Sequence, residues 1–234
     1  MIRAAFSTRM SWHDLLFAHW PVDAARLRML VPPALALDLH EGTAWLGVVP
    51  FRMTRMGPRF LPPIPGLHAF PELNVRTYVV RDGRPGVWFF SLDAAKKLAV
   101  RVARRFFHLP YFDARMTCRA DGDAVAYRSE RTHAASPPAR FSARYAPSGE
   151  EVFAAKGSLD AFLTDRMCLY AAGGDGLLRR VDIEHGPWPL APATCRIEEN
   201  TMGASLGFDL AEPPAVLRFV RSIDVISRAM VRAE

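Results

Sequence analysis

Hydrophobic and polar positions alternate along much of the chain, with the period of two that half-buried β-strands favour. The segments "ELNVRTYVV" and "GVWFFSLDA" flank "RDGRP", in which Asp82-Gly83 predicts a hairpin turn. "FDARMTCRA" and "AVAYRSERT" flank Asp121-Gly122 in the same way, and "RFSARYAPSGEEVFA" predicts a further hairpin that turns at residues 147–149. Successive hairpins of this kind predict a mostly antiparallel sheet.

Other segments extend the sheet or interrupt it. "LALDLHEGTAWLGVVPFRM" predicts two strands around a Glu41-Gly42 turn, and "GLLRRVDIEHGPWPLAPATCRIEE" predicts strands with a proline-rich break. Residues 57–71 contain five prolines, which exclude a central strand or a helix interior and predict an ordered loop. The pattern from about Val216 to Met230 favours no particular element.

Three segments have helical character. "DAARLRMLVPP" predicts a short helix with Asp23 as its N-cap and two prolines ending it. Residues 158–171, "SLDAFLTDRMCLYA", predict a helix capped by Ser158. "DAAKKLAVRVARRFFH" predicts a third helix, with Asp93 near its N-cap. We therefore expect one domain over residues 1–234, a mainly β fold with a closed or conical antiparallel barrel and peripheral helices.

Composition narrows the class of protein. Half of the 234 residues are hydrophobic, which favours a folded core over disorder. The first fifteen residues contain charges and no continuous apolar run, so they do not resemble a signal peptide, and no segment is apolar for long enough to span a bilayer. We expect a soluble, cytoplasmic protein without membrane partners.

The cysteine spacing and the distribution of charge argue against a metal site and a nucleic-acid partner. Cys118, Cys168 and Cys195 are far apart and lack zinc-ligand spacing, which predicts reduced thiols, no metal site and no cofactor. The net charge is +6, but the arginines are scattered among acids, and only "RVARR" is locally dense. We therefore expect a small-molecule ligand rather than nucleic acid as the partner, with a homo-oligomer left open.

The chain has only three lysines, and Lys96 and Lys97 are adjacent. On a helix, Lys96 falls in an apolar arc with Val100 and Ala103, whereas Lys97 falls on the basic face. Burial and the neighbouring ammonium would both disfavour a protonated Lys96 amine, and a Schiff-base nucleophile must be neutral. The alternative is a surface lysine whose amine extends into water.

Other polar residues could form a ligand site. Glu72, Asn74 and Arg76 alternate along one predicted strand and share a face, which either lines the barrel interior or contacts solvent. Arg166 and Tyr170 are four residues apart on a predicted helix and could hold a carboxylate or play structural roles. His185, before "GPWPL", could contact a ligand or be structural.

Several long motifs carry a family resemblance. "HWPVDAARLRMLVPPAL", "TAWLGVVPFRM", "FPELNVRTYV", "GVWFFSLDA", "LPYFDARM", "FLTDRMCLYA" and "IEHGPWPLAPA" together resemble the YqjF-like family of uncharacterised bacterial proteins, over about residues 10–200. That family is similar to acetoacetate decarboxylase, a closed or conical antiparallel barrel. The resemblance therefore implies the same fold as the hairpin pattern.

The resemblance also implies roles for three residues. Acetoacetate decarboxylase has a Schiff-base lysine followed by a second lysine, and "AAKKLAV" resembles that stretch, with Lys96 as nucleophile and Lys97 as the perturbing cation. Glu72 resembles its pocket glutamate. Trp45, however, stands where the decarboxylase has another carboxylate, and His13 falls near its pocket arginine.

Two classes of function follow from these residues. One is a Schiff-base lyase that acts on a small oxo-acid, with Lys96, Lys97 and Glu72 as catalytic groups and Arg76 or Arg166 as carboxylate anchor. The other is a non-catalytic protein that binds or senses a small molecule on the same scaffold.

Overall fold

The structure is a computed structural model that describes residues 7–62, 69–173 and 175–233. The helices are α1 (Ala24–Met29), α2 (Lys97–Phe106), α3 (Leu159–Thr164) and the 3-10 helix η2 (Ala204–Leu206). The strands are β1 (Thr8–Val22), β2 (Ala36–Leu37), β3 (Ala44–Pro58), β4 (Ala69–Arg81), β5 (Arg84–Ala94), β6 (Tyr111–Asp121), β7 (Ala124–Arg131), β8 (Arg140–Pro147), β9 (Cys168–Ala172), β10 (Leu178–His185), β11 (Ala191–Asn200), β12 (Val216–Ser227) and β13 (Val231–Arg232).

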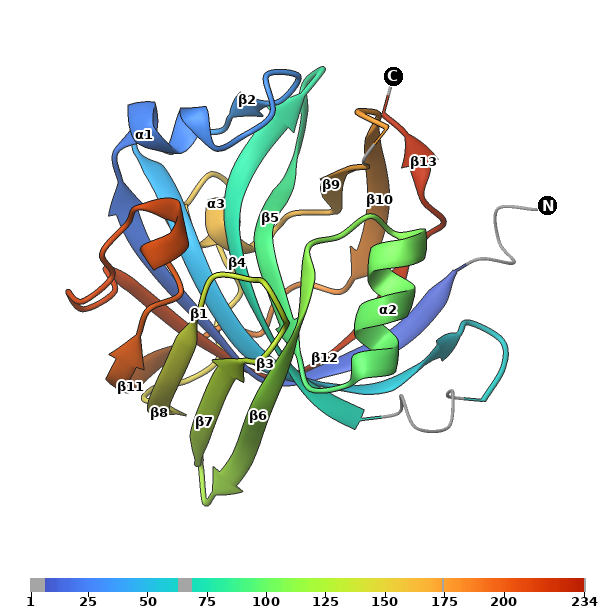
Figure 1. Cartoon of the computed structure of the whole chain (residues 1–234). Coiled ribbons are helices and arrows are strands. Elements are labelled where there is room, and N and C mark those ends of the chain that lie inside the picture. Colours follow the sequence, from blue (N-terminus) through green and yellow to red (C-terminus); the bar gives the residue numbers. More distant parts are fainter. Residues whose placement is uncertain (1–6, 63–68, 174, 234) are drawn as a thin grey trace.

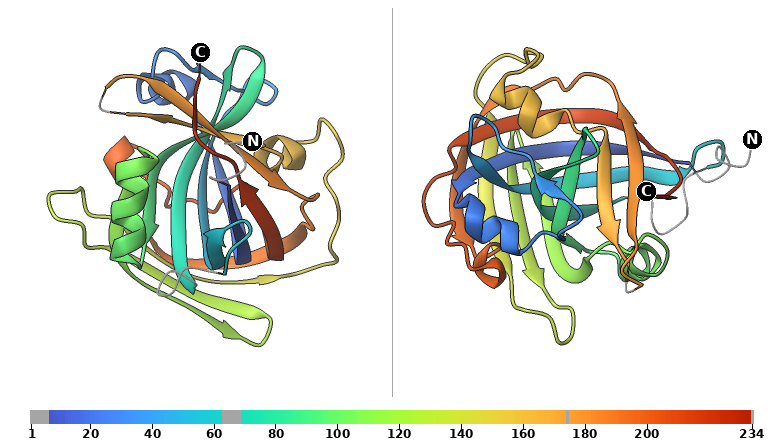
Figure 2. Two further views of the ribbon diagram at one scale, coloured as in Figure 1. Left: turned by 90° about the vertical axis from the view of Figure 1, so that its right-hand side faces the viewer. Right: turned by 90° about the horizontal axis from the view of Figure 1, so that it is seen from above.

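Strand pairing closes a mixed β-barrel with few helices around it (Figures 1 and 2). Within the described residues, nine strands form the ring β5-β6-β7-β8-β11-β12-β1-β3-β4, and β4 returns to β5. Strands β9 and β10 make a second bridge between β5 and β12. Most pairs are antiparallel, but β5 pairs in parallel with both β6 and β9. The prediction of a mainly β, closed barrel is therefore confirmed.

The strands β12, β1, β3, β4 and β5 form a wall that is covered on both faces. Successive residues of β1 pack into different cores: Leu16 and Ala18 join the cluster with β7 and β8, whereas Leu15 and Phe17 join the cluster on the opposite face. Burial on both faces explains why this part of the sequence is almost continuously apolar instead of alternating.

The predicted hairpin at Asp82-Gly83 is confirmed, with β4 and β5 paired from Glu72↔Ala94 to Arg81↔Arg84. Asp82 and Gly83 have positive φ angles of 49° and 72°, as tight hairpin turns of the primed kind require. The hairpin around Asp121-Gly122 also forms, between β6 and β7. At α1, the Asp23 side chain caps the helix by accepting from Arg26 N at 2.7 Å.

Two predicted elements were wrong where tertiary pairing decided the outcome. Strand β8 pairs with β7 and β11, so the predicted hairpin at residues 147–149 does not form, and Val152 makes only an isolated bridge to Leu190. The predicted 158–171 helix is capped by Ser158 but ends at Thr164. The following segment becomes β9, because it is buried between β5 and β10.

The prediction for α2 was wrong in its start and right only in part about its packed face. Asp93 belongs to β5, where it is fully buried and paired with Arg131 at 2.8 Å, so it cannot cap a helix. Helix α2 begins at Lys97 and packs through Ala99 and Val100, while Leu98 is 60% exposed. Val100 therefore packs as the apolar arc predicted, whereas Leu98 and Phe106, which were also expected to pack, are exposed.

The proline-rich stretch and the stretch that the sequence left unassigned contain more strand than the sequence predicted. Strand β3 continues to Pro58 and β4 starts at Ala69, so the predicted 57–71 loop is shorter, and its residues 63–68 lie outside the described part. The stretch from Val216, for which the sequence favoured no element, is the long strand β12.

Candidate functional site

One face of β4 carries a row of buried polar side chains. Glu72, Asn74 and Arg76 are only 3%, 5% and 9% exposed, and the fully buried Tyr78 continues the row. Their face is covered by α3 and by the second bridge of strands, since Tyr78 packs with Leu163, Leu169 and Val181. The polar row is therefore buried and does not contact solvent. It lies on the face of β4 opposite to Leu73 and Val75, which pack with Tyr127 and Phe141 inside the nine-strand ring. The space that the polar row faces, under the second bridge of strands, is called the interior site below.

Glu72 lies at one end of the row. The Tyr111 hydroxyl donates to its Oε2 at 2.9 Å. Burial raises the pKa of Glu72 to about 8, against the opposing effect of the Tyr111 hydrogen bond. The carboxyl group is consequently mostly protonated and neutral near pH 7, and it cannot serve as a counter-ion for the arginine further along the strand.

Arg76 has hydrogen-bonding capacity that the protein does not use. Its guanidinium lies 5.0 Å from the centre of the Phe17 ring, and Nη2 donates to the Leu163 carbonyl at 3.1 Å. Among the described residues, no carboxylate oxygen lies within 4.0 Å of it, and its buried Nε has no acceptor. Burying a cation without a counter-ion is unfavourable, so this arrangement favours an external anion.

His19 on β1 faces the same interior. The Tyr78 hydroxyl donates its one proton to the Leu163 carbonyl at 2.8 Å, so His19 Nε2, 2.6 Å away, must donate to that hydroxyl. Burial, and then the nearby charge of Arg76, hold the pKa of His19 well below 6.5. The ring is therefore neutral, and its Nδ1 is a buried acceptor to which no described residue donates.

Gly47 makes room for these side chains. The register aligns His19, Gly47 and Arg76 across β1, β3 and β4. A Cβ at position 47 would lie 2.8 Å from His19 Nε2 and 3.4 Å from Arg76 Cγ. The missing side chain thus allows the imidazole and the arginine to lie over the same strand.

Of the other predicted ligand residues, only Arg166 lies beside this interior cluster. It is paired with Asp38 at 2.5 Å, and its guanidinium lies 5.0 Å from the Tyr78 ring centre. Tyr170 is on β9 rather than on a helix with Arg166, and its hydroxyl donates to the Arg84 carbonyl. His185 packs against Trp188 and lines a separate surface cleft.

The two lysines lie outside the barrel interior. Lys96 and Lys97 are exposed, just beyond Ala94, the cross-strand partner of Glu72. Lys97 lines an open basic cleft with Arg101. Of the two alternatives for Lys96, the structure therefore has the surface lysine, because Lys96 precedes the first turn of α2 instead of lying on its packed face.

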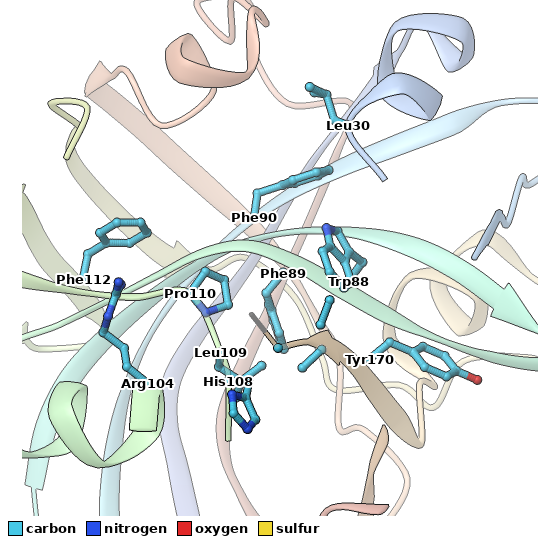
Figure 3. Close-up of a pocket in the computed structure, with 13 residues that line it drawn as sticks. Leu30, Trp88, Phe89, Phe90, Arg104, His108, Leu109, Pro110, Phe112 and Tyr170 are labelled. Carbon is cyan, nitrogen blue, oxygen red and sulfur yellow. The ribbon is translucent and has the colours of Figure 1, made fainter. Parts of the chain in front are cut away.

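An aromatic cleft of about 460 Å³ opens where β5 leaves β9 and approaches β6 (Figure 3). Its walls include Trp88, Phe89, Phe90, Leu109 and Phe112, with the guanidinium of Arg104 and the imidazole of His108 as polar groups. Phe89 and Phe90 point to opposite sides of β5 in Figure 3. This surface cleft was not predicted from the sequence.

The sequence also missed His19, Tyr78 and Tyr111. A signal for His19 was present, since it is the one ionisable residue in the apolar run "LLFAHW". Tyr78 continues the two-residue period of the polar row on β4. Tyr111 approaches Glu72 only through the parallel pairing of β5 and β6, which no local pattern encodes.

A family of uncharacterised proteins matches most of the chain. DUF2071, described as "Uncharacterized conserved protein (COG2071)", matches residues 9–223. The chain belongs to the DUF2071 family. It is 47% identical over 218 residues to "Uncharacterized protein YqjF" of Bacillus subtilis (strain 168), which covers 93% of this chain and 89% of that protein. The sequence resemblance to YqjF-like proteins is thereby confirmed.

Solved structures place this DUF2071 protein among acetoacetate decarboxylase-like folds. Acetoacetate decarboxylase from Legionella pneumophila gives a TM-score of 0.66 at 13% identity, covering 98% of this chain and 88% of that chain. An acetoacetate decarboxylase-like enzyme from Sphingomonas wittichii RW1 gives 0.65 at 14% identity, covering 98% and 93%. At such low identity the likeness concerns the fold alone.

Metal-binding clusters and membrane-spanning helices are both absent from the described part of this DUF2071 protein. Its described residues contain no group of three or more His, Cys, Asp or Glu side chains arranged to hold a metal ion. None of its described helices is long and apolar enough to span a bilayer.

Proposed function

We propose that this protein binds a small carboxylate-bearing molecule, without a covalent bond, in the interior between β1, β3, β4 and α3. Arg76 is the anchor for the carboxylate. The observation that carries the proposal is the buried Arg76 guanidinium, which has no acidic partner among the described residues and an unused Nε–H. A carboxylate would supply both the missing charge and a strong, charge-assisted hydrogen bond.

The polar groups near Arg76 complement a ligand that also carries a hydrogen-bond donor. His19 Nδ1 and Asn74 Oδ1 are buried atoms that have no hydrogen-bond partner among the residues that the structure describes. Both could accept from a hydroxyl or amine on the same molecule, and His19 Nδ1 is available as an acceptor because the ring is neutral. Glu72, in its protonated form, provides a further polar contact without adding negative charge near the carboxylate.

The Schiff-base alternative is less well supported by the positions of the side chains. The fold resembles that of proteins named for acetoacetate, which is itself a small carboxylate. However, Lys96 is exposed, so water would stabilise its charged form. We expect borohydride treatment with acetoacetate or pyruvate to leave no added mass on Lys96. A trapped adduct that disappears in Lys96→Arg would instead favour a lyase.

The central experiment replaces Arg76 with an apolar side chain of similar length. Arg76→Met removes an uncompensated charge, and the Leu163 carbonyl keeps its hydrogen bond from Tyr78. We expect the free protein to become more stable by about 1–3 kcal/mol, while calorimetric titration with acetate, pyruvate and acetoacetate shows no binding.

Arg166→Met is the matched control. Arg166 is also buried but is paired with Asp38, so its loss leaves a carboxylate without its partner. We expect this variant to be less stable than the wild type. If Arg76→Met is destabilised in the same way and small carboxylates bind neither protein, Arg76 is a structural residue and the proposal is wrong.

A further inference from the structure

Two side chains, Phe89 and Leu109, both line the aromatic cleft and pack against the cluster beside the interior site. Phe89 lies directly opposite Arg76 in the β4–β5 register, and opposed residues of antiparallel strands lie on the same face, about 5 Å apart. Phe89 packs against the cluster that contains Trp45 and Tyr78, yet it is only partly buried. It also lines the cleft on the surface. One ring therefore contacts the interior on one side and the cleft on the other.

Around Phe89 and Phe90, β5 pairs with β4 on one edge, and neither β9 nor β6 pairs with its other edge. Strand β5 pairs with β9 at Val87 and Trp88, and with β6 only from Leu92 onward. The segment around Phe89 and Phe90 lies between these two pairings, at a register shift in the β4–β5 ladder. The two neighbouring strands diverge at this position, and the cleft occupies the space between them.

The chemistry of the cleft differs from that of the interior. Its walls are mainly aromatic and aliphatic, and its volume of about 460 Å³ is within the range of small-molecule sites. The interior offers a cation and unpaired polar atoms. An elongated amphipathic molecule, polar at one end and apolar at the other, would satisfy both regions together.

We propose that the ligand of the interior site is a carboxylate with an apolar tail of several carbons, which passes Phe89 and lies in the aromatic cleft. The inference rests on the proposed function, since Arg76 holds the carboxylate end. It adds the class of ligand: aliphatic or aryl-substituted acids are preferred over short acids such as acetate. Trp88 and Leu109 contact the tail.

The test compares straight-chain acids from acetate to octanoate by calorimetric titration. Beyond the first carbons, each added methylene should lower the dissociation constant about fourfold until the cleft is filled. In Ala172→Trp, a bulky ring would obstruct the cleft from an exposed position at the end of β9. This variant should bind octanoate no more tightly than butyrate, with acetate unaffected. Ala120→Trp, an exposed strand position outside the cleft, should behave as wild type.

A second measurement locates the tail independently of Ala172→Trp. The bromine of 8-bromooctanoate quenches nearby tryptophan fluorescence, and Trp88 lines the cleft. We expect quenching in the wild type that is largely lost in Trp88→Phe. Quenching that persists in this variant would place the tail elsewhere.

The outcomes separate the two proposals. If no acid of any length binds, the proposed function itself fails. If acetate and octanoate bind equally well and Ala172→Trp changes neither, the interior site stands and the tail inference is wrong. If octanoate still binds tightly to Arg76→Met, the carboxylate is not held at Arg76, and both fail.

Discussion

Replacing Glu72 with glutamine should change how the stability of the protein depends on pH. Glu72 is buried, and its pKa rises from 4.5 to about 8 in the folded protein. A carboxyl group with a raised pKa in the folded state stabilises it below the unfolded pKa, and this contribution is lost as the pH rises through the folded value. The wild type should therefore lose stability between about pH 4.5 and pH 8, relative to a variant that cannot ionise at this position.

The expected size of the effect follows from the same two values. Each pH unit between 4.5 and 8 contributes about 1.4 kcal/mol, so the full effect is about 5 kcal/mol. Between pH 5 and pH 9, the expected change is about 4 kcal/mol. Glutamine can still accept the Tyr111 hydrogen bond, so Glu72→Gln should be close to the wild type in stability at pH 5 and clearly more stable at pH 9.

Urea denaturation at several pH values measures this difference directly. The matched control is Glu151→Gln, since Glu151 is an exposed residue and its loss should leave the pH dependence of the wild type unchanged. The reasoning is refuted if the difference in free energy of unfolding between wild type and Glu72→Gln stays constant from pH 5 to pH 9. That result would mean that Glu72 ionises as it does in the unfolded chain.

Three further substitutions test the surroundings of the site. Gly47→Ala should lower stability by about 1–3 kcal/mol in urea denaturation and weaken acetate binding, because its methyl group displaces His19. Asp93→Asn should destabilise by about 3–5 kcal/mol in the same assay, because Arg131 is only 3% exposed and loses its counter-charge. Ser158→Ala should cost about 1 kcal/mol through loss of the α3 cap, and thermal melting unchanged from wild type would contradict that role.

The sequence predicted those features that depend on local chemistry. The Asp82-Gly83 turn needs two positive φ angles, and the Asp23 cap needs a short acceptor side chain. The shared face of Glu72 and Arg76 follows from the geometry of any strand. The sequence did not decide which way that face pointed, because this depends on α3 and the second bridge of strands covering it.

The failures came from residues whose conformation is decided by distant partners. Cys168 and Tyr170 continue a helical pattern, but pairing with β10 and β5 makes them a strand. Lys96 was expected on a packed helix face, and instead it precedes α2, since burial of Asp93 beside Arg131 extends β5 to Ala94. In both places a long-range contact outweighs a local preference that favours another structure.

The wall of strands covered on both faces has a mechanical consequence. One lobe, with β7 and β8, covers one face of the wall, and the other lobe, with β9, β10 and α3, covers the opposite face. Neither lobe can separate from the wall without exposing one of its apolar surfaces. The Tyr127 hydroxyl of the first lobe also donates to the Glu72 carbonyl of the wall at 2.7 Å. The two lobes should therefore unfold together, and amide hydrogens of β1 and β3 should exchange only through global opening. Substitutions that weaken the packing of β7 and β8 can thus alter the interior site on the opposite face, because both pack against the same wall of strands.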